Sequence, residues 1–343
     1  MDPQGEFAGK NIVFAEKTAN ETATYFKKDL KIIQAILDQS KQKLFNRRRL
    51  RPRPHLDDKI LTDWNGLMIS SLSFGARVLN EPRYLEAAER SARFIKMNLI
   101  SNNGRLLHRF RDRDAAILGT IEDYAFYVHG LLDLYESTFN LDYLKQSIAL
   151  AADMVELFWD QESGGFYFTA KDTERLLFKQ KEIYDGAIPS GNSIATLDLL
   201  RIYHMTSAES WKDKVDGQFK YFASQISKQP SSYAQMLSAF NFAIGPTKEI
   251  VISASSNNDY PAEIVSEVYK RFVPNKVMLL HPLSGPDAES ITEIAPYVAS
   301  QQLVNGKTTV YLCEDRICKL PVTDLADFKK LLDLTGHVLK KMQ

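Results

Sequence analysis

The sequence has few of the features that mark disulfide-rich, membrane or secreted proteins. It contains only two cysteines in 343 residues, Cys313 and Cys318, too few for a disulfide framework. Their C-x4-C spacing has no second Cys or His pair, so we expect structural cysteines, with reversible oxidation as the alternative. No apolar run reaches the roughly 18 residues of a transmembrane helix, and no signal peptide is visible. We therefore predict no membrane association and a cytoplasmic location.

The charge balance excludes a second group of functions. Lys plus Arg total 43 and Asp plus Glu total 43, so the formal net charge is zero. Such a chain lacks the broad attraction to phosphates that nucleic-acid-binding proteins have. Neither G-x-G-x-x-G nor a P-loop is present, so nucleotide binding has no support. We expect no cofactor and no metal.

The sequence does contain a repeat of about sixty residues. Three landmarks recur 60 positions later, in the pairs Asp63 and Asp123, Asn80 and Asn140, Gly104 and Gly164. A looser third copy begins near Ser193, and a half-copy covers residues 233–244. Repeats of this kind bury their apolar faces against one another, so they predict a stacked architecture.

Each copy predicts two helices. The first is apolar nearly all round, as at Leu131, Leu132 and Leu134, and the second is amphipathic. Buried helices inside a layer of half-exposed ones describe an α/α toroid of helical hairpins. We predict a mainly α fold, a partial toroid over residues 1–246, with inner helices that start near Trp64, Tyr124 and Ser193 on one face. We also expect a helix over residues 23–45 and short strands such as residues 165–168.

After residue 246 the pattern changes. KEIVISA, NKVMLLHP and TTVYLCE have the composition of strands, and AEIVSEVYKRF and DLADFKKLLDL that of helices. These segments predict a small α/β portion over residues 247–343.

Four stretches carry a resemblance to a known family. RPRPHLDDKILTDWNGLMISSL, IEDYAFYVHGLLDLY, DGAIPSGNSIA and VYLCEDRICKLPVTD resemble, in this order, the YyaL-type family, which includes thioredoxin-domain-containing, spermatogenesis-associated proteins. The resemblance implies an N-terminal thioredoxin-like domain and a six-hairpin toroid similar to glycosidases and N-acylglucosamine 2-epimerases. This chain has no C-x-x-C and about three and a half hairpins, so it resembles the C-terminal half. We expect an exposed apolar edge and, as partner, the missing N-terminal half.

Polar and aromatic residues gather where the inner helices are predicted to start. The candidate catalytic carboxylates are Asp57, Asp58, Asp63, Glu122, Asp123 and Asp185. The candidate substrate-binding residues are Arg53, His55, Trp64, Asn65, Tyr124, Tyr184, Ser190 and Asn192. Helix capping explains Asp63, Asp123 or Asn192 individually but not the aromatic neighbours. Carboxylates mixed with aromatic rings suit a sugar or glycan as ligand.

Two enzyme chemistries and one rival class remain open. Glycoside hydrolysis needs a protonated and an ionised carboxyl group. Epimerisation needs acid and base groups, for which His55 is the best candidate, whereas we expect His129 in the core and His108 on a surface or rim loop. The arginine-rich run over residues 47–53 is a solvated loop or an anion clamp. The rival is a non-catalytic binding or redox-partner module that serves a thioredoxin-like domain absent from this chain.

Overall fold

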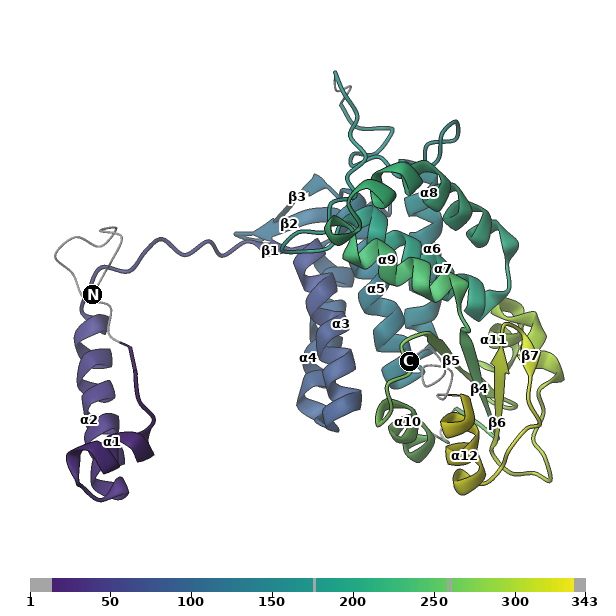
Figure 1. Ribbon diagram of the computed structural model, residues 1–343. Coiled ribbons are helices and arrows are strands. Elements are labelled where there is room, and N and C mark those ends of the chain that lie inside the picture. Colours follow the sequence, from purple (N-terminus) through teal and green to yellow (C-terminus); the bar gives the residue numbers. More distant parts are fainter. Residues whose placement is uncertain (1–13, 175–176, 258, 260, 336–343) are drawn as a thin grey trace. The chain divides into compact units, whose positions relative to one another are not determined.

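Three helical hairpins and one further helix form the centre of the computed structural model (Figure 1). The hairpins pair α3 (Thr62–Leu79) with α4 (Pro82–Asn98), α5 (Ile121–Thr138) with α6 (Leu141–Phe158), and α7 (Gly191–Thr206) with α8 (Glu209–Lys228). Helix α9 (Ala234–Ile244) packs against α7. Helices α3, α5, α7 and α9 contact one another in this order, and α5 and α7 are buried on nearly all sides. The fold is mainly α, a partial α/α toroid, as the sequence predicts.

The structure describes residues 14–174, 177–257, 259 and 261–335, and the chain divides into the units Met1–Asp58 and Lys59–Gln343. The first unit holds α1 (Ala19–Phe26) and α2 (Leu30–Arg49). The prediction of one helix over residues 23–45 is wrong, because Lys27 has a left-handed conformation and Asp29 caps a new helix. No helix in the described ranges is both long enough and apolar enough for a membrane span.

The turns inside the hairpins explain why the sequence repeats, but they show that one of the three matched residue pairs is not structurally equivalent. Asn80, Phe139 and Ser207 have φ values of 53°, 53° and 61°, and each ends its inner helix in a left-handed conformation. Asn140 instead caps α6 by accepting a hydrogen bond from the Asp142 N–H. The structural equivalent of Asn80 is therefore Phe139, and the match of Asn80 with Asn140 was misleading.

Two glycines bring α3 and α5 close together. A Cβ atom at Gly66 would overlap the backbone of Phe126 and Tyr127, and one at Gly130 would lie 2.7 Å from the Gly66 carbonyl oxygen. Only residues without a side chain permit this approach. The close packing places the N-terminal ends of the two helices side by side.

A small sheet lies at the same end as these helix starts. Its strands, in antiparallel order, are β1 (Ile60–Leu61), β2 (Leu107–Arg111) and β3 (Asp114–Leu118). The strand predicted over residues 165–168 is wrong, because only Phe166 pairs there, in a single bridge to Trp159. The sheet therefore combines the residues just before α3 with those that connect α4 to α5.

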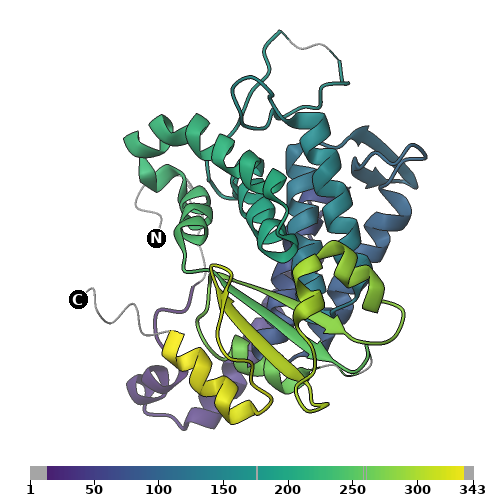
Figure 2. The ribbon, with the colours of Figure 1, turned by 90° about the vertical axis from the view of Figure 1, so that its right-hand side faces the viewer.

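The predicted α/β portion is present, and its sheet lies against the hairpin helices (Figure 2). Its buried apolar residues belong to the same core as those of the hairpins. The α/β portion consists of β4 (Lys248–Ala254), α10 (Ala262–Tyr269), β5 (Lys276–Pro282), α11 (Ala288–Ile294), β6 (Thr309–Glu314), β7 (Ile317–Cys318) and α12 (Leu325–Thr335). The strand order is β5-β4-β6-β7, with β4 and β5 parallel and the other pairs antiparallel. Cys313 and Cys318 form a disulfide between β6 and β7.

A buried ion network joins the hairpins to this sheet. The Asp133 carboxylate forms ion pairs with the guanidinium groups of Arg77 at 3.3 Å and Arg201 at 3.0 Å. The Glu136 carboxylate pairs with Arg77 at 3.1 Å. The Tyr269 hydroxyl of α10 donates to Glu136 at 2.9 Å, and the Arg77 guanidinium lies 4.4 Å from the Tyr269 ring centre. Burial alone would raise the pKa of Asp133, but the arginines around it lower the value.

Candidate functional site

The candidate site is an acidic cluster at the starts of α3 and α5. The backbone N–H of Asp63 donates to Asp123 Oδ1 at 3.1 Å, although the two residues are 60 positions apart. Both side chains are buried, Asp123 completely. The prediction that the inner helices begin on one face is therefore confirmed for α3 and α5.

Asp123 has a structural role that the sequence only partly suggested. Its Oδ2 accepts the backbone N–H of Thr120 at 2.8 Å and the Thr120 hydroxyl at 3.1 Å, as the third helical residue of a capping box. Thr120, not Asp123, is the N-cap residue. The Asp123 carboxylate thus fixes the start of α5 and the start of α3 at once.

His108 joins this cluster, and its placement on a surface or rim loop is wrong. The residue lies on β2, whose pairing with β3 turns its ring inwards, and its Nδ1 lies 3.0 Å from Asp123 Oδ1 and 3.1 Å from Oδ2. The hydrogen bond to Asp123 raises the pKa of His108 because it stabilises the protonated ring. No local pattern in the sequence marks this hairpin, because Asp112-Arg113 at its turn is not one of the dipeptides that favour a two-residue turn.

Glu122 in this cluster has a strongly raised pKa. Burial raises its pKa to about 7, and the negative charges of Asp63 and Asp123 add to the effect. The start of α7 closes one side, since a Cβ at Gly191 would lie 3.1 Å from Glu122 Cγ. Burial and Asp123 also raise the pKa of Asp63. A carboxyl group that is partly protonated near neutral pH is suited to general acid catalysis.

The predicted site residues around α7 form hydrogen bonds mainly with backbone groups. Ser190 caps α7 by accepting the Ser193 N–H at 3.2 Å. Asn192 accepts the Phe166 N–H and donates to two carbonyl oxygens, so it holds a loop against the helix. Asp185 accepts three backbone N–H groups, from Ser190, Gln235 and Met236. These contacts shape the end of the toroid and leave Asp185 outside the acidic cluster.

The predicted aromatic residues have different environments. Trp64 and Tyr184 are each 59% exposed, so their rings are available to a ligand. Tyr124 is fully buried, and its hydroxyl accepts the backbone N–H of Leu106 at 3.1 Å, so it belongs to the core and not to a cleft wall. Asn65 donates to the Leu61 carbonyl oxygen, which supports the first turn of α3.

Four of the predicted site residues lie in the first unit. These are Arg53, His55, Asp57 and Asp58. Arg53 lines a cavity of about 440 Å³ together with Phe45 and Arg48. Their assignment to the site of the second unit stays a prediction.

Asp63, His108 and Asp123 are also the residues that could hold a metal ion. Each offers a ligand atom, and these atoms lie within 4.8 Å of one another. Without an ion these groups already have hydrogen-bond partners, because His108 pairs with Asp123 and the Asp123 oxygens accept hydrogen bonds from backbone N–H groups.

His129 was predicted to be in the core. It lies in the buried ion network, with its Nδ1 2.6 Å from an oxygen of Asp198.

Inner helices that start together at an acidic cluster define a protein of the α/α toroid class. No protein-family model matches the chain. Human spermatogenesis-associated protein 20 is 31% identical over 342 residues, which cover 97% of this chain and 43% of that protein. An uncharacterized Caenorhabditis elegans protein is 28% identical, with 97% and 46% covered. The chain is thus a homologue of spermatogenesis-associated protein 20, as the four motifs indicated, and it spans less than half the length of these relatives.

Solved structures share the general arrangement at low similarity. Cellobiose 2-epimerase from Bacillus thermoamylovorans superposes with a TM-score of 0.44 and 14% identity, over 78% of this chain and 68% of that chain. A family 76 glycoside hydrolase (mannosidase) from Bacteroides thetaiotaomicron gives 0.40 and 17%, over 52% and 46%.

Proposed function

We propose that the acidic cluster at the starts of α3 and α5 processes a sugar or glycan, with Glu122 as general acid. The observation that carries this proposal is the pKa of Glu122, raised to about 7 by burial beside two further carboxylates. Asp63 serves as the second carboxylate, which stabilises positive charge on the sugar ring or activates water. Trp64 and Tyr184, both exposed, offer their ring faces to the sugar.

For epimerisation the same residues take other roles. Proton removal from a sugar carbon needs a base on one side and an acid on the other. His108 replaces His55 as the better candidate, because Asp123 orients its Nδ1 and the ring is only partly buried. Glu122 then supplies or accepts the second proton. Hydrolysis and epimerisation are thus two outcomes of one proposed site.

The experiment is a mass-spectrometric screen of the chain against sugars and glycans in D2O. Hydrolysis adds water to the substrate, whereas epimerisation introduces one deuterium at the reacting carbon. Glu122→Gln should lower turnover about 100-fold or more, as loss of a general acid does. Glu156→Gln, an exposed change on α6, is the matched control. Unchanged turnover in Glu122→Gln, or no product from any substrate, contradicts the proposal.

The alternative proposal is a non-catalytic binding module. It is favoured by the carboxylates of Asp123 and Asp185, which are already used by backbone N–H groups. In that case sugars bind without turnover, and Trp64→Ala weakens binding while Glu122→Gln does not. A cytoplasmic location stays a prediction in either case.

A further helical hairpin is the partner that we infer for the open side of α3. That helix leaves several large apolar side chains exposed, whereas α5 is enclosed. Apart from Trp64 at the site, the exposed ones on α3 are Met68, Phe74, Val78 and Leu79. We expect the isolated chain to dimerise or aggregate through this face. Size-exclusion chromatography with light scattering tests this, and a stable monomer at all concentrations contradicts it.

A further inference from the structure

A cavity of about 390 Å³ lies at the C-terminal end of α7, at the opposite end of that helix from Ser190 and Asn192. Parts of α7, α8 and α9 and the turn between β6 and β7 form its walls. Its apolar and aromatic lining consists of Leu200, Tyr203, Val215, Phe219, Phe240, Ala243 and Ile244. A cavity of this size and character is suited to a small organic molecule.

One buried polar side chain, His204, lines the cavity. Its Nδ1–H donates to Glu249 Oε1 at 2.8 Å, and the buried Glu249 also accepts the Arg316 backbone N–H at 3.0 Å. Because a carboxylate can only accept, Nδ1 carries the proton. In the neutral ring Nε2 then has a free lone pair and acts as a hydrogen-bond acceptor.

Nε2 of His204 is unpaired but can be reached. Within the described ranges no group bonds to it, and it is not among the buried atoms sealed from solvent without a partner. His129 differs, because its Nδ1 bonds to Asp198 and its Nε2 faces Asp133 at 3.8 Å inside the ion network. His204 therefore lines the cavity with one ring nitrogen bonded to Glu249 and the other without a partner in the described part of the chain.

Charges at the rim of the cavity balance one another. Lys212 and Arg316 are cationic and Asp216 and Asp315 anionic, and Lys212 pairs with Asp216 at 2.5 Å. The rim therefore attracts neither anions nor cations, which favours a neutral ligand. The ligand must offer one donor to Nε2 and an apolar body to the aromatic walls.

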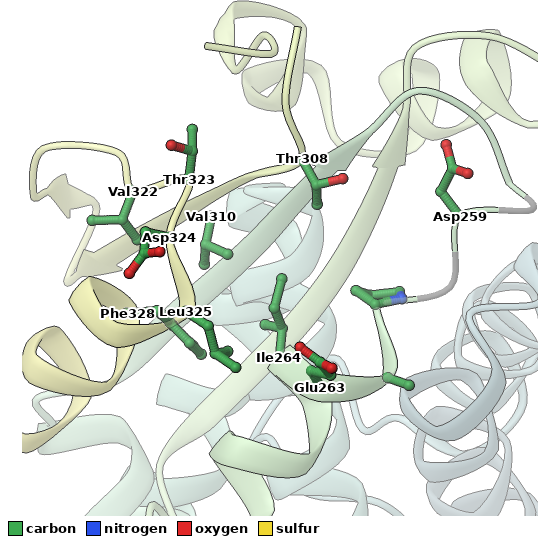
Figure 3. Close-up of a pocket in the computed structure, with 12 residues that line it drawn as sticks. Asp259, Glu263, Ile264, Thr308, Val310, Val322, Thr323, Asp324, Leu325 and Phe328 are labelled. Carbon is green, nitrogen blue, oxygen red and sulfur yellow. The ribbon is translucent and has the colours of Figure 1, made fainter. Parts of the chain in front are cut away.

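A second cavity of about 430 Å³, between α10, α12 and β6, lacks this combination (Figure 3). Its apolar floor includes Val310 and Phe328, but its carboxylates Asp259, Glu263 and Asp324 are exposed to solvent. Asp324 is also used to cap α12. The cavity beside His204 thus gives the stronger case for a specific ligand.

We propose that this cavity binds a neutral aromatic alcohol of the phenol class. The aromatic ring lies against Phe219 and Phe240, and the hydroxyl group donates to His204 Nε2. Glu249 is the positioning residue, because its hydrogen bond sets which nitrogen of His204 is the acceptor.

The experiment is an NMR titration of the chain with phenol, anisole and toluene. Anisole matches phenol in shape but has no hydroxyl donor, so phenol should bind about tenfold more tightly than anisole. His204→Leu should abolish this preference, and Lys220→Leu, an exposed change on α8 outside the cavity, should keep it.

Val215→Trp tests the cavity without changing His204 or Glu249. The larger side chain should fill the space and remove binding of all three probes, with the fold checked by circular dichroism. Equal affinity for phenol and anisole overturns the proposal, as does phenol binding that persists in Val215→Trp. These two results decide the question even if His204→Leu does not fold.

Discussion

Helices α3 and α5 carry two polar clusters that differ in charge balance. At their starts, the carboxyl groups of Asp63, Glu122 and Asp123 lie near the partly buried imidazole of His108, and the pKa values of Asp63 and Glu122 are raised. Towards their ends, Asp133 and Glu136 are matched by Arg77 and Arg201. Tyr269 covers that second cluster from the α/β portion.

This difference in charge balance indicates that the ion network stabilises the fold, whereas the acidic cluster is available for chemistry. The ion network is buried and neutralised, so its charges hold the hairpins against the sheet. The acidic cluster holds excess negative charge that raises the pKa of Glu122 and Asp63. Unbalanced carboxylates of this kind are a feature of functional sites more often than of stabilising ones. The following predictions test this distinction, beginning with the largest effect.

Asp133→Ala should have the largest effect on stability. It leaves the guanidinium groups of Arg77 and Arg201 buried with one carboxylate between them, so the unfolding free energy should fall by about 3–5 kcal/mol. Urea denaturation followed by circular dichroism measures the change. Glu156→Ala removes an exposed ion pair with Lys171 and should cost less than about 1 kcal/mol. Similar losses in both variants would show that the buried ion pairs of Asp133 stabilise the fold no more than the exposed pair of Glu156 with Lys171.

Asp123→Asn should have an intermediate effect, because the amide keeps one acceptor but loses the charge facing His108. We expect a loss of about 1–2 kcal/mol and a lower His108 pKa, measured by NMR titration. The raised pKa of His108 contributes stability that is fully present below about pH 6.5 and is lost as the pH rises through the folded-state value.

The loss in Asp123→Asn should therefore shrink as the pH rises above 7. If the variant melts several degrees lower but binds sugars as the wild type does, Asp123 serves the helix start alone. An unchanged His108 pKa would contradict the ion pair.

Glu122→Gln should hardly reduce stability and should increase it at high pH. A raised carboxyl pKa gives stability that is fully present below about pH 4.5 and is lost as the pH rises through about 7. Glutamine resembles the protonated acid, so above pH 8 the variant should be more stable by up to ~1 kcal/mol, allowing for solvent screening. A variant that is less stable at pH 8 would show that the Glu122 carboxylate is paired.

Trp64→Ala should have the smallest effect on stability, within about 0.5 kcal/mol, because the ring is exposed. Sugar affinity should fall about 3- to 10-fold if the ring stacks on the ligand. Isothermal titration calorimetry measures the affinity. Met97→Ala, at a still more exposed position on α4, is the control and should leave sugar binding unchanged.

The repeat made the helical part of the fold predictable. Period, apolar pattern and turn residues are local properties, and they placed the starts of α3, α5 and α7 within about three residues. The pairing of Asn80 with Asn140 misled because sequence identity at a turn does not fix which side of the turn a residue occupies. The strands of the α/β portion were predictable from their runs of branched apolar residues.

The candidate site was predictable only where its residues start a helix. Asp63 and Glu122 carried that signal, but His108 reaches the cluster through a strand pairing that no local pattern reports. The ion network was missed for a related reason. Asp133 and Arg201 lie in helices that are otherwise apolar, and only tertiary packing shows that they meet.

The position of β5 at the edge of the four-stranded sheet has a consequence for assembly. Edge strands present unpaired backbone groups that can recruit a strand from another chain. Here α5 and α7 lie against β5, and the Leu280 N–H donates to the Tyr135 hydroxyl at 3.4 Å. The opposite edge, β7, has only two residues. Strand addition at β5 would require these helices to move away, so the toroid protects the sheet from the backbone pairing that begins cross-β aggregation.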